Sequence, residues 1–189
     1  MASLGSAATT RAGAGLAMGA LSAALLLGCG GAKKEADAPI GVSVVSSPAS
    51  MPVSYNFSSI DDRPVSSDAA RGKVAVFALV TTWDLASQAQ VDFLLAMAKN
   101  DGDKVFYGLI ALEEKSNREL VEAYVRMLKV PFPAAMASPS AMRHGGPFGE
   151  IREVPTLVLI DAQGRVAWTK TGLVKADEIR AAMRALPGK

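Results

Sequence analysis

Residues 73–87 read KVAVFALVTTWDLAS, and this stretch decides the fold. Its first part, 73–80, is an unbroken apolar run rich in β-branched side chains, which is typical of a strand buried on both faces. From 85 to 99 the apolar residues instead recur at the spacing of an amphipathic helix. A buried strand that leads directly into a helix predicts an α/β domain. The apolar face of this helix comprises Val91, Leu94, Leu95 and Ala98.

The rest of the chain alternates between strand and helix in the same way. This alternation predicts a mixed sheet flanked by helices, with parallel strands at its centre and antiparallel strands added by hairpins. A Gly/Pro-rich loop is expected between the second helix and the strand that follows it. The predicted elements are an N-terminal hairpin at 53–66, strands at 105–112, 156–160 and 165–170, a helix at 117–129 with Leu120, Val121, Tyr124, Val125 and Leu128 on its apolar face, and a last helix carrying Ile179, Ala182, Met183 and Leu186.

The composition excludes several classes of function. The chain has 189 residues, and 20 Lys+Arg against 18 Asp+Glu give a net charge of only +2, so we expect no nucleic-acid partner. The single cysteine excludes an internal disulfide, a zinc site built on several cysteines and a dithiol redox centre within the chain. The single histidine, His144, is expected in an exposed loop, and we expect neither a metal nor a cofactor.

The N-terminus has the pattern of an export signal. Arg11 precedes an apolar run that ends in Leu26-Leu27-Gly28-Cys29, which resembles the bacterial lipobox. The resemblance implies that residues 1–28 are removed and that the Cys29 thiol carries lipid. The alternatives are an uncleaved anchor and an incidental cysteine beside an ordinary signal. Residues 29–52 are rich in Ala, Ser, Gly and Pro and predict a flexible tether ahead of a folded domain at 53–189.

The predicted location is the bacterial cell envelope. Lipid on Cys29 would hold the protein on a membrane with its domain facing the periplasm. Gly30, rather than aspartate, follows the cysteine, and this favours the outer membrane.

Four stretches at the junctions of the predicted elements together have a recognisable pattern. They are Arg71-Gly72-Lys73-Val74-Ala75-Val76-Phe77, Thr81-Thr82-Trp83, Glu153-Val154-Pro155-Thr156, and Leu159-Ile160-Asp161 with Gly164-Arg165-Val166. In this order they resemble the thioredoxin fold, and more closely the TlpA/ResA-type branch of membrane-tethered thioredoxin-like proteins. The resemblance covers about residues 55–186 and implies a thioredoxin-like domain with an N-terminal β-hairpin extension, in which Pro155 follows a cis peptide bond.

The chain departs from this family at the residues that do its chemistry. The family's Trp-Cys-x-x-Cys motif would fall on residues 83–87, where Asp84 and Ser87 replace both cysteines. Dithiol exchange needs an attacking thiolate and a resolving thiol, so no disulfide oxidoreductase activity and no catalytic residue are expected. Asp84 is expected to cap the helix; an acid–base or ligand-binding role is the alternative.

The resemblance also implies a substrate-binding groove, which this chain could retain without the two cysteines. The resemblance implies that Val154 offers its backbone to an extended peptide and that Trp83 forms the opposite wall. The alternative is that these residues only hold the fold. Residues 113–115, Glu-Glu-Lys, are expected in a solvated loop or at the start of the second helix. The predicted groove comprises Thr82, Trp83, Asp84, Val154 and Pro155.

Taken together, the sequence predicts a redox-inactive thioredoxin-like lipoprotein that binds a protein or peptide partner in the envelope. Two alternatives stay open. One is a non-redox enzyme that uses Asp84 or Glu153 as a general acid or base. The other, implied only by the resemblance, is an accessory factor in cytochrome or metal-centre assembly.

Overall fold

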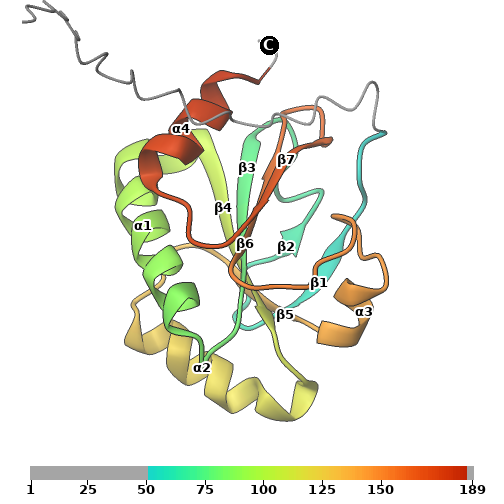
Figure 1. Ribbon diagram of the computed structural model, residues 1–189, viewed down its shortest axis with the longest axis vertical. Helices are drawn as coiled ribbons and strands as arrows, with labels where there is room; N and C mark the ends of the chain where they lie inside the picture. Colours follow the sequence, from blue (N-terminus) through green and yellow to red (C-terminus); the bar gives the residue numbers. More distant parts are fainter. Residues whose placement is uncertain (1–50, 187–189) are drawn as a thin grey trace, which may run out of the picture. The chain divides into compact units, whose positions relative to one another are not determined.

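The computed structural model describes residues 51–186. Their strands form one seven-stranded sheet in the order β2-β1-β5-β4-β3-β6-β7 (Figure 1). The predicted signal peptide, Cys29 and the predicted tether up to residue 50 lie outside the described residues. The strands are β1 (Asn56–Ser59), β2 (Val65–Ser66), β3 (Val74–Val80), β4 (Val105–Leu112), β5 (Ala134–Ala137), β6 (Thr156–Ile160) and β7 (Val166–Thr171), and the helices are α1 (Leu85–Asp101), α2 (Arg118–Met127), α3 (Pro139–Arg143) and α4 (Ala176–Arg184), with short 3-10 turns η1 (Gly102–Lys104) and η2 (Lys115–Asn117).

Strand β3 divides the hydrophobic core into two halves, because successive side chains of a strand point to opposite faces. Val76, Ala78 and Val80 pack against α1, α2 and α4 on one face of the sheet. Ala75, Phe77 and Leu79 face the other side, where α3 and the N-terminal hairpin cover them. All but the first residue of β3 are buried, which explains its unbroken apolar sequence.

The predicted strand directions are confirmed. β3 pairs parallel with β4, and β4 pairs parallel with β5. β6 pairs antiparallel with both β3 and β7. β1 and β2 form the predicted N-terminal hairpin, although β1 begins at Asn56 rather than at residue 53. The sheet is therefore mixed, with parallel pairing at its centre.

The predicted Gly/Pro-rich loop is wrong in part, because it contains β5 and α3. β5 reads AAMA and joins β1 to β4, so it completes the sheet between two strands that are distant in sequence. Alanine has little preference for strands, and four residues carry no readable period. α3 has only five residues and begins with Pro139 directly after Ser138.

The second helix differs from its predicted apolar face at one position. Val121, Tyr124 and Val125 are buried as expected, but Leu120 is 53% exposed.

The first helix buries Gln90 completely, which an apolar periodicity cannot predict. The Gln90 amide donates to the Val174 carbonyl at 3.1 Å and accepts from the Val174 N–H at 2.7 Å. This pair of bonds ties α1 to the loop between β7 and α4.

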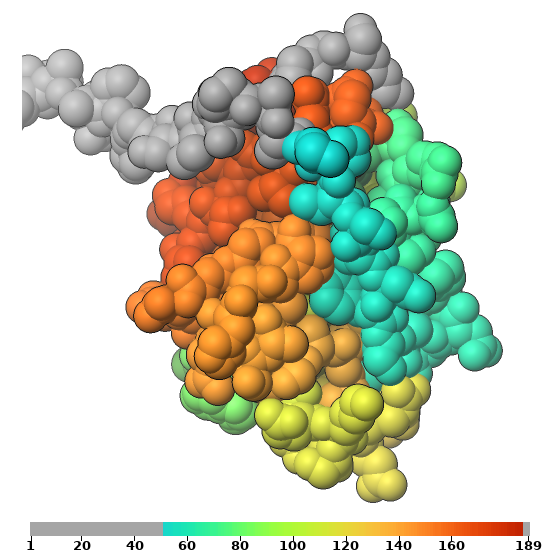
Figure 2. Space-filling model, turned by 90° about the vertical axis from the view of Figure 1, so that its right-hand side faces the viewer, coloured from blue at the N-terminus to red at the C-terminus, as the bar shows by residue number. Residues whose placement is uncertain are grey.

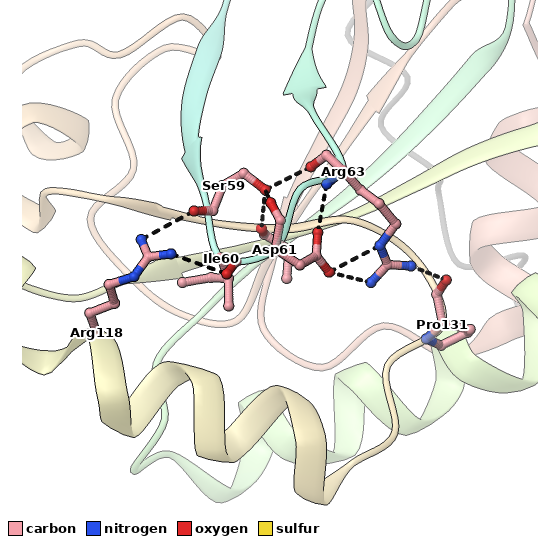
Figure 3. A network of polar contacts seen from close by, with 7 residues as sticks. Ser59, Ile60, Asp61, Arg63, Arg118 and Pro131 are labelled. Carbon is pink, nitrogen blue, oxygen red and sulfur yellow. Dashed lines mark hydrogen bonds and ion pairs between the residues drawn. The ribbon is translucent and has the colours of Figure 1, made fainter.

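The N-terminal hairpin is fastened to the segments around it. Its start lies beside residues 138–155 on one face of the molecule (Figure 2). The ring centroids of Tyr55 and Phe148 are 5.2 Å apart. Its turn is held by Asp61, which pairs with Arg63 (Figure 3). Arg118 of α2 donates to the carbonyls of Ser59 and Ile60, both at 3.1 Å. Among residues 51–186, no helix is long and apolar enough to cross a membrane.

A close contact between β3 and β4 yields a first prediction. A Cβ atom at Gly108 would lie 2.5 Å from the Phe77 ring, which Tyr55, Phe106 and Phe148 surround. Gly108→Ala should therefore lower the free energy of unfolding by about 1–3 kcal/mol, measured by urea denaturation. Phe77→Leu in the same chain should recover part of the loss in a double-mutant cycle. Unchanged stability of Gly108→Ala would refute the contact.

Candidate functional site

The predicted site forms where β3 ends and α1 begins. Residues 81–84, Thr-Thr-Trp-Asp, make this junction. Thr81 is buried, whereas the Trp83 side chain is 78% exposed and Leu85, the first residue of the helix, is 80% exposed. An indole with this much exposure adds little to the core, so Trp83 is available for contact with another molecule.

Asp84 is the N-cap of α1, as the sequence predicts. Its carboxylate accepts from the Ser87 backbone N–H at 2.7 Å. Hydrogen bonds from the Ser87 hydroxyl and then from the Ser87 and Ala86 N–H groups hold the pKa of Asp84 below its ordinary value, against a smaller opposing effect of burial. A general base at neutral pH needs a raised carboxylate pKa, so this site does not favour acid–base work by Asp84.

Ser87 is fully buried and has a structural contact of its own. Its hydroxyl accepts from the Thr81 N–H at 3.4 Å. The side chain of Asp84 and the hydroxyl of Ser87 therefore both make hydrogen bonds that fix the start of α1. The two positions at which the resemblance would place thiols hold groups that satisfy backbone donors.

Glu113 lies at the site, and its prediction as part of a solvated loop is wrong. It directly follows β4, and it is only 6% exposed. Its Oε1 accepts from the Thr82 N–H at 3.0 Å and from the Thr82 hydroxyl at 2.8 Å. Its Oε2 accepts from the Asn117 amide at 3.0 Å. Since β3 and β4 are parallel neighbours, their carboxyl ends meet, and this brings Glu113 to the loop that carries Trp83.

These hydrogen bonds keep Glu113 ionised. Burial alone would raise its pKa, but the donors on Thr82 and Asn117 together lower the pKa below its ordinary value. Sequence reasoning missed this residue because its neighbours, Glu114 and Lys115, are exposed and read as a solvated segment.

The loop before β6 forms the other side of the site. The Val154–Pro155 peptide bond is cis, and the Pro155 carbonyl accepts from the Gly172 N–H at 2.8 Å. The Glu153 carbonyl accepts from the Thr156 hydroxyl at 2.7 Å. Within residues 51–186, neither the N–H nor the C=O of Val154 has a hydrogen-bond partner. An unpaired backbone at a partly exposed residue is available to an added strand.

Trp83 and Val154 line one pocket of about 570 Å³. Two of the five predicted groove residues thus come together there. Thr82 is instead engaged by Glu113, Asp84 caps the helix, and Pro155 is buried behind Val154. Glu153, the second candidate acid, is exposed and lines the same pocket. The remaining lining residues are Thr81, Leu112, Glu113, Glu114, Asn117, Pro139, Arg143, Ile151 and Arg152.

His144 is not among the residues that line this pocket, although its neighbour Arg143 is. It is exposed as predicted, follows α3 directly, and its Nδ1 lies 2.8 Å from the Ser140 carbonyl oxygen. Across residues 51–186, no three His, Cys, Asp or Glu side chains gather in a way that could hold a metal ion.

Known structures share this architecture. A thiol:disulfide interchange protein of the thioredoxin family from Chlorobium tepidum has a TM-score of 0.62 and 22% identity over 72% of this chain and 95% of its own. A DsbF homologue from Corynebacterium diphtheriae has a TM-score of 0.67 and 18% identity over 78% of this chain and 96% of its own. The fold is thioredoxin-like.

A third structure with the thioredoxin-like fold is an exposed lipoprotein thioredoxin from Streptococcus pneumoniae. Its TM-score is 0.56, with 20% identity over 70% of this chain and 99% of its own. No protein-family model and no curated protein matches the chain. Identities this low establish the fold alone. On this thioredoxin-like fold, residues 51–186 contain no cysteine.

The Asp84 cap gives a second prediction. Asp84→Ala should lower the free energy of unfolding by about 1 kcal/mol at pH 7. Asp84→Asn should lower it much less, because asparagine also caps helices well. Because the pKa of Asp84 is lowered by folding, its stabilisation is complete above the ordinary pKa of about 4 and is lost as the pH falls through the folded value. Urea unfolding from pH 7 downward measures this.

The control for Asp84 is Asp92→Ala, which removes an exposed acid from the middle of the same helix. This variant should not reproduce the loss at pH 7. A destabilisation by Asp84→Ala that is equal at pH 7 and well below pH 4 would contradict the role of the ionised cap.

Proposed function

We propose that this protein is a redox-inactive relative of the TlpA/ResA-type proteins that binds an extended segment of a partner protein. The observation that carries the proposal is the unpaired backbone of Val154 beside the exposed indole of Trp83 on one pocket. An extended peptide that pairs with Val154 would gain main-chain hydrogen bonds, and Trp83 would cover one of its side chains.

The loss of dithiol chemistry follows from the atoms at the start of α1. A carboxylate at residue 84 and a hydroxyl at residue 87 cannot form or resolve a mixed disulfide. The chain's one cysteine is Cys29, and a lipidated sulfur is not a thiolate. We infer that Cys29 anchors the protein on the periplasmic side of an envelope membrane, with the outer membrane favoured by Gly30.

The enzymatic alternative is weaker. Asp84 is committed to the helix cap with a lowered pKa, which leaves Glu153 as the candidate acid. Glu153 is exposed, and the buried carboxylate on the same pocket, Glu113, has a lowered pKa because Thr82 and Asn117 donate to it, which does not favour acid–base work. A role in cytochrome or metal-centre assembly is compatible with partner binding, and it rests only on the resemblance.

A reductase assay tests redox inactivity. The purified protein should reduce insulin disulfides no faster than the reductant in the buffer. A matched variant with both Asp84→Cys and Ser87→Cys places two thiols at the start of α1, where the helix N-terminus favours a thiolate. This variant should exceed the background and so validate the assay. Clear activity of the unmodified chain would overturn the proposal.

Photocrosslinking tests the groove. A photoreactive residue at position 83 should capture an envelope protein through an extended segment, identified by mass spectrometry. The same residue at position 127 is the control, because Met127 is an exposed apolar residue of α2, 66% exposed, that does not line the pocket. In a separate affinity capture without a crosslinker, Trp83→Ala should leave stability unchanged and should recover about tenfold less partner than the unmodified protein. Equal capture from positions 83 and 127 would count against the groove.

A further inference from the structure

Glu113 is a buried carboxylate that faces a pocket and has no cationic partner. Among the described residues, no Lys or Arg nitrogen lies within 4.0 Å of its oxygens, although seven other ion pairs form. Its three hydrogen bonds come from neutral groups. A carboxylate accepts about four hydrogen bonds, so one position remains open. Buried charged side chains in proteins are usually paired with an opposite charge, so a cationic ligand group would complete the environment of Glu113.

The buried and the exposed charged residues that line the pocket differ in net charge. Glu113 is the one charged lining residue that is buried, and the other charged lining residues are exposed. At the rim, two acids, Glu114 and Glu153, balance Arg143 and Arg152. Exposed charges are screened by water and salt, whereas a charge with little solvent contact acts more strongly. The interior of the pocket is therefore electronegative.

The walls beside Glu113 are apolar. Leu112 and Ile151 are buried, with 7% and 3% of their surface exposed, and Trp83 and Val154 line the same pocket. The Thr81 hydroxyl is buried and has no hydrogen-bond partner within residues 51–186, and Thr81 also lines this pocket. An occupant of matching chemistry has an apolar stem and a cationic end that donates hydrogen bonds.

We propose that this pocket receives a lysine or arginine side chain of the bound peptide, with its cationic end on Glu113. The aliphatic stem lies against Leu112 and Ile151, and the indole of Trp83 covers it. This inference rests on the proposed function, because it names the class of peptide that the groove selects. Glu113 is then the residue that determines specificity.

The chain's own basic residues near Glu113 do not fill this role. Lys115 and Arg118 line an adjacent pocket of about 270 Å³ that shares Glu113. Arg118 is committed to the carbonyls of Ser59 and Ile60 (Figure 3) and to Glu122 at 2.9 Å. Lys115 is exposed and forms no ion pair among the described residues.

A peptide library tests the proposal with the full-length protein. Each pool of acetylated hexapeptides fixes one position as lysine, arginine, norleucine or glutamate and randomises the others. The lysine and arginine pools should bind about tenfold or more tightly than the norleucine pool at one position, because norleucine keeps the stem and lacks the charge. Glutamate at that position should bind most weakly.

Two variants attribute the preference to Glu113. Glu113→Gln should abolish the ratio between the lysine and norleucine pools while the norleucine pool still binds. Glu114→Gln removes an exposed acid from the same pocket and should keep the ratio. Damage to the loop would weaken both pools alike, so the ratio separates recognition from structure.

The outcomes separate this inference from the proposed function. If no pool binds the unmodified protein, both fail. If pools bind without a preference for lysine or arginine, or if the preference survives Glu113→Gln, this inference fails and peptide binding stands.

Discussion

The structure depends on the complete burial of β3 between two layers. Its even-numbered residues pack against α1, α2 and α4, and its odd-numbered residues pack against α3 and the hairpin. A strand with no solvent-facing side must be apolar throughout, and both of its edges must be paired, here by β4 and β6. The close approach of Gly108 to Phe77 shows how little room the second layer leaves. The position of this strand therefore sets where the loop at 81–84 begins.

Three polar side chains then hold that loop. Asp84 caps α1, the Ser87 hydroxyl accepts from Thr81, and Glu113 accepts from Thr82. Each bond satisfies a backbone donor that the turn from strand to helix would otherwise leave unpaired. At the two positions where the fold's redox relatives are expected to carry thiols, the chain has polar groups engaged in its own structure. The shape of the loop therefore rests on hydrogen bonds made by the chain's own side chains.

The sequence predicted those parts of the fold that depend on long apolar patterns. The strands predicted at 73–80 and 105–112 are long apolar runs, and the helix predicted at 85–99 has an amphipathic period. Each was found within two residues of its predicted bounds. β5 was missed because four residues of AAMA carry no period, and it is a strand only because β1 and β4 flank it. Glu113 was missed because its role depends on which strands are neighbours.

The Glu113 carboxylate accepts hydrogen bonds from the loop at 81–84 and also lines the pocket. One side chain therefore stabilises the loop and, in the proposed function, recognises the ligand. Thr82 and Asn117 fix the position of Glu113 from two elements, so its open acceptor site has a fixed direction before any ligand arrives. Trp83 is the opposite case, because its backbone is held through its neighbours while its indole stays exposed. A carboxylate that is held in place before binding loses little conformational entropy when a ligand arrives. In the proposed function, selection of an extended peptide would therefore depend on this preformed loop and its carboxylate rather than on a thiol.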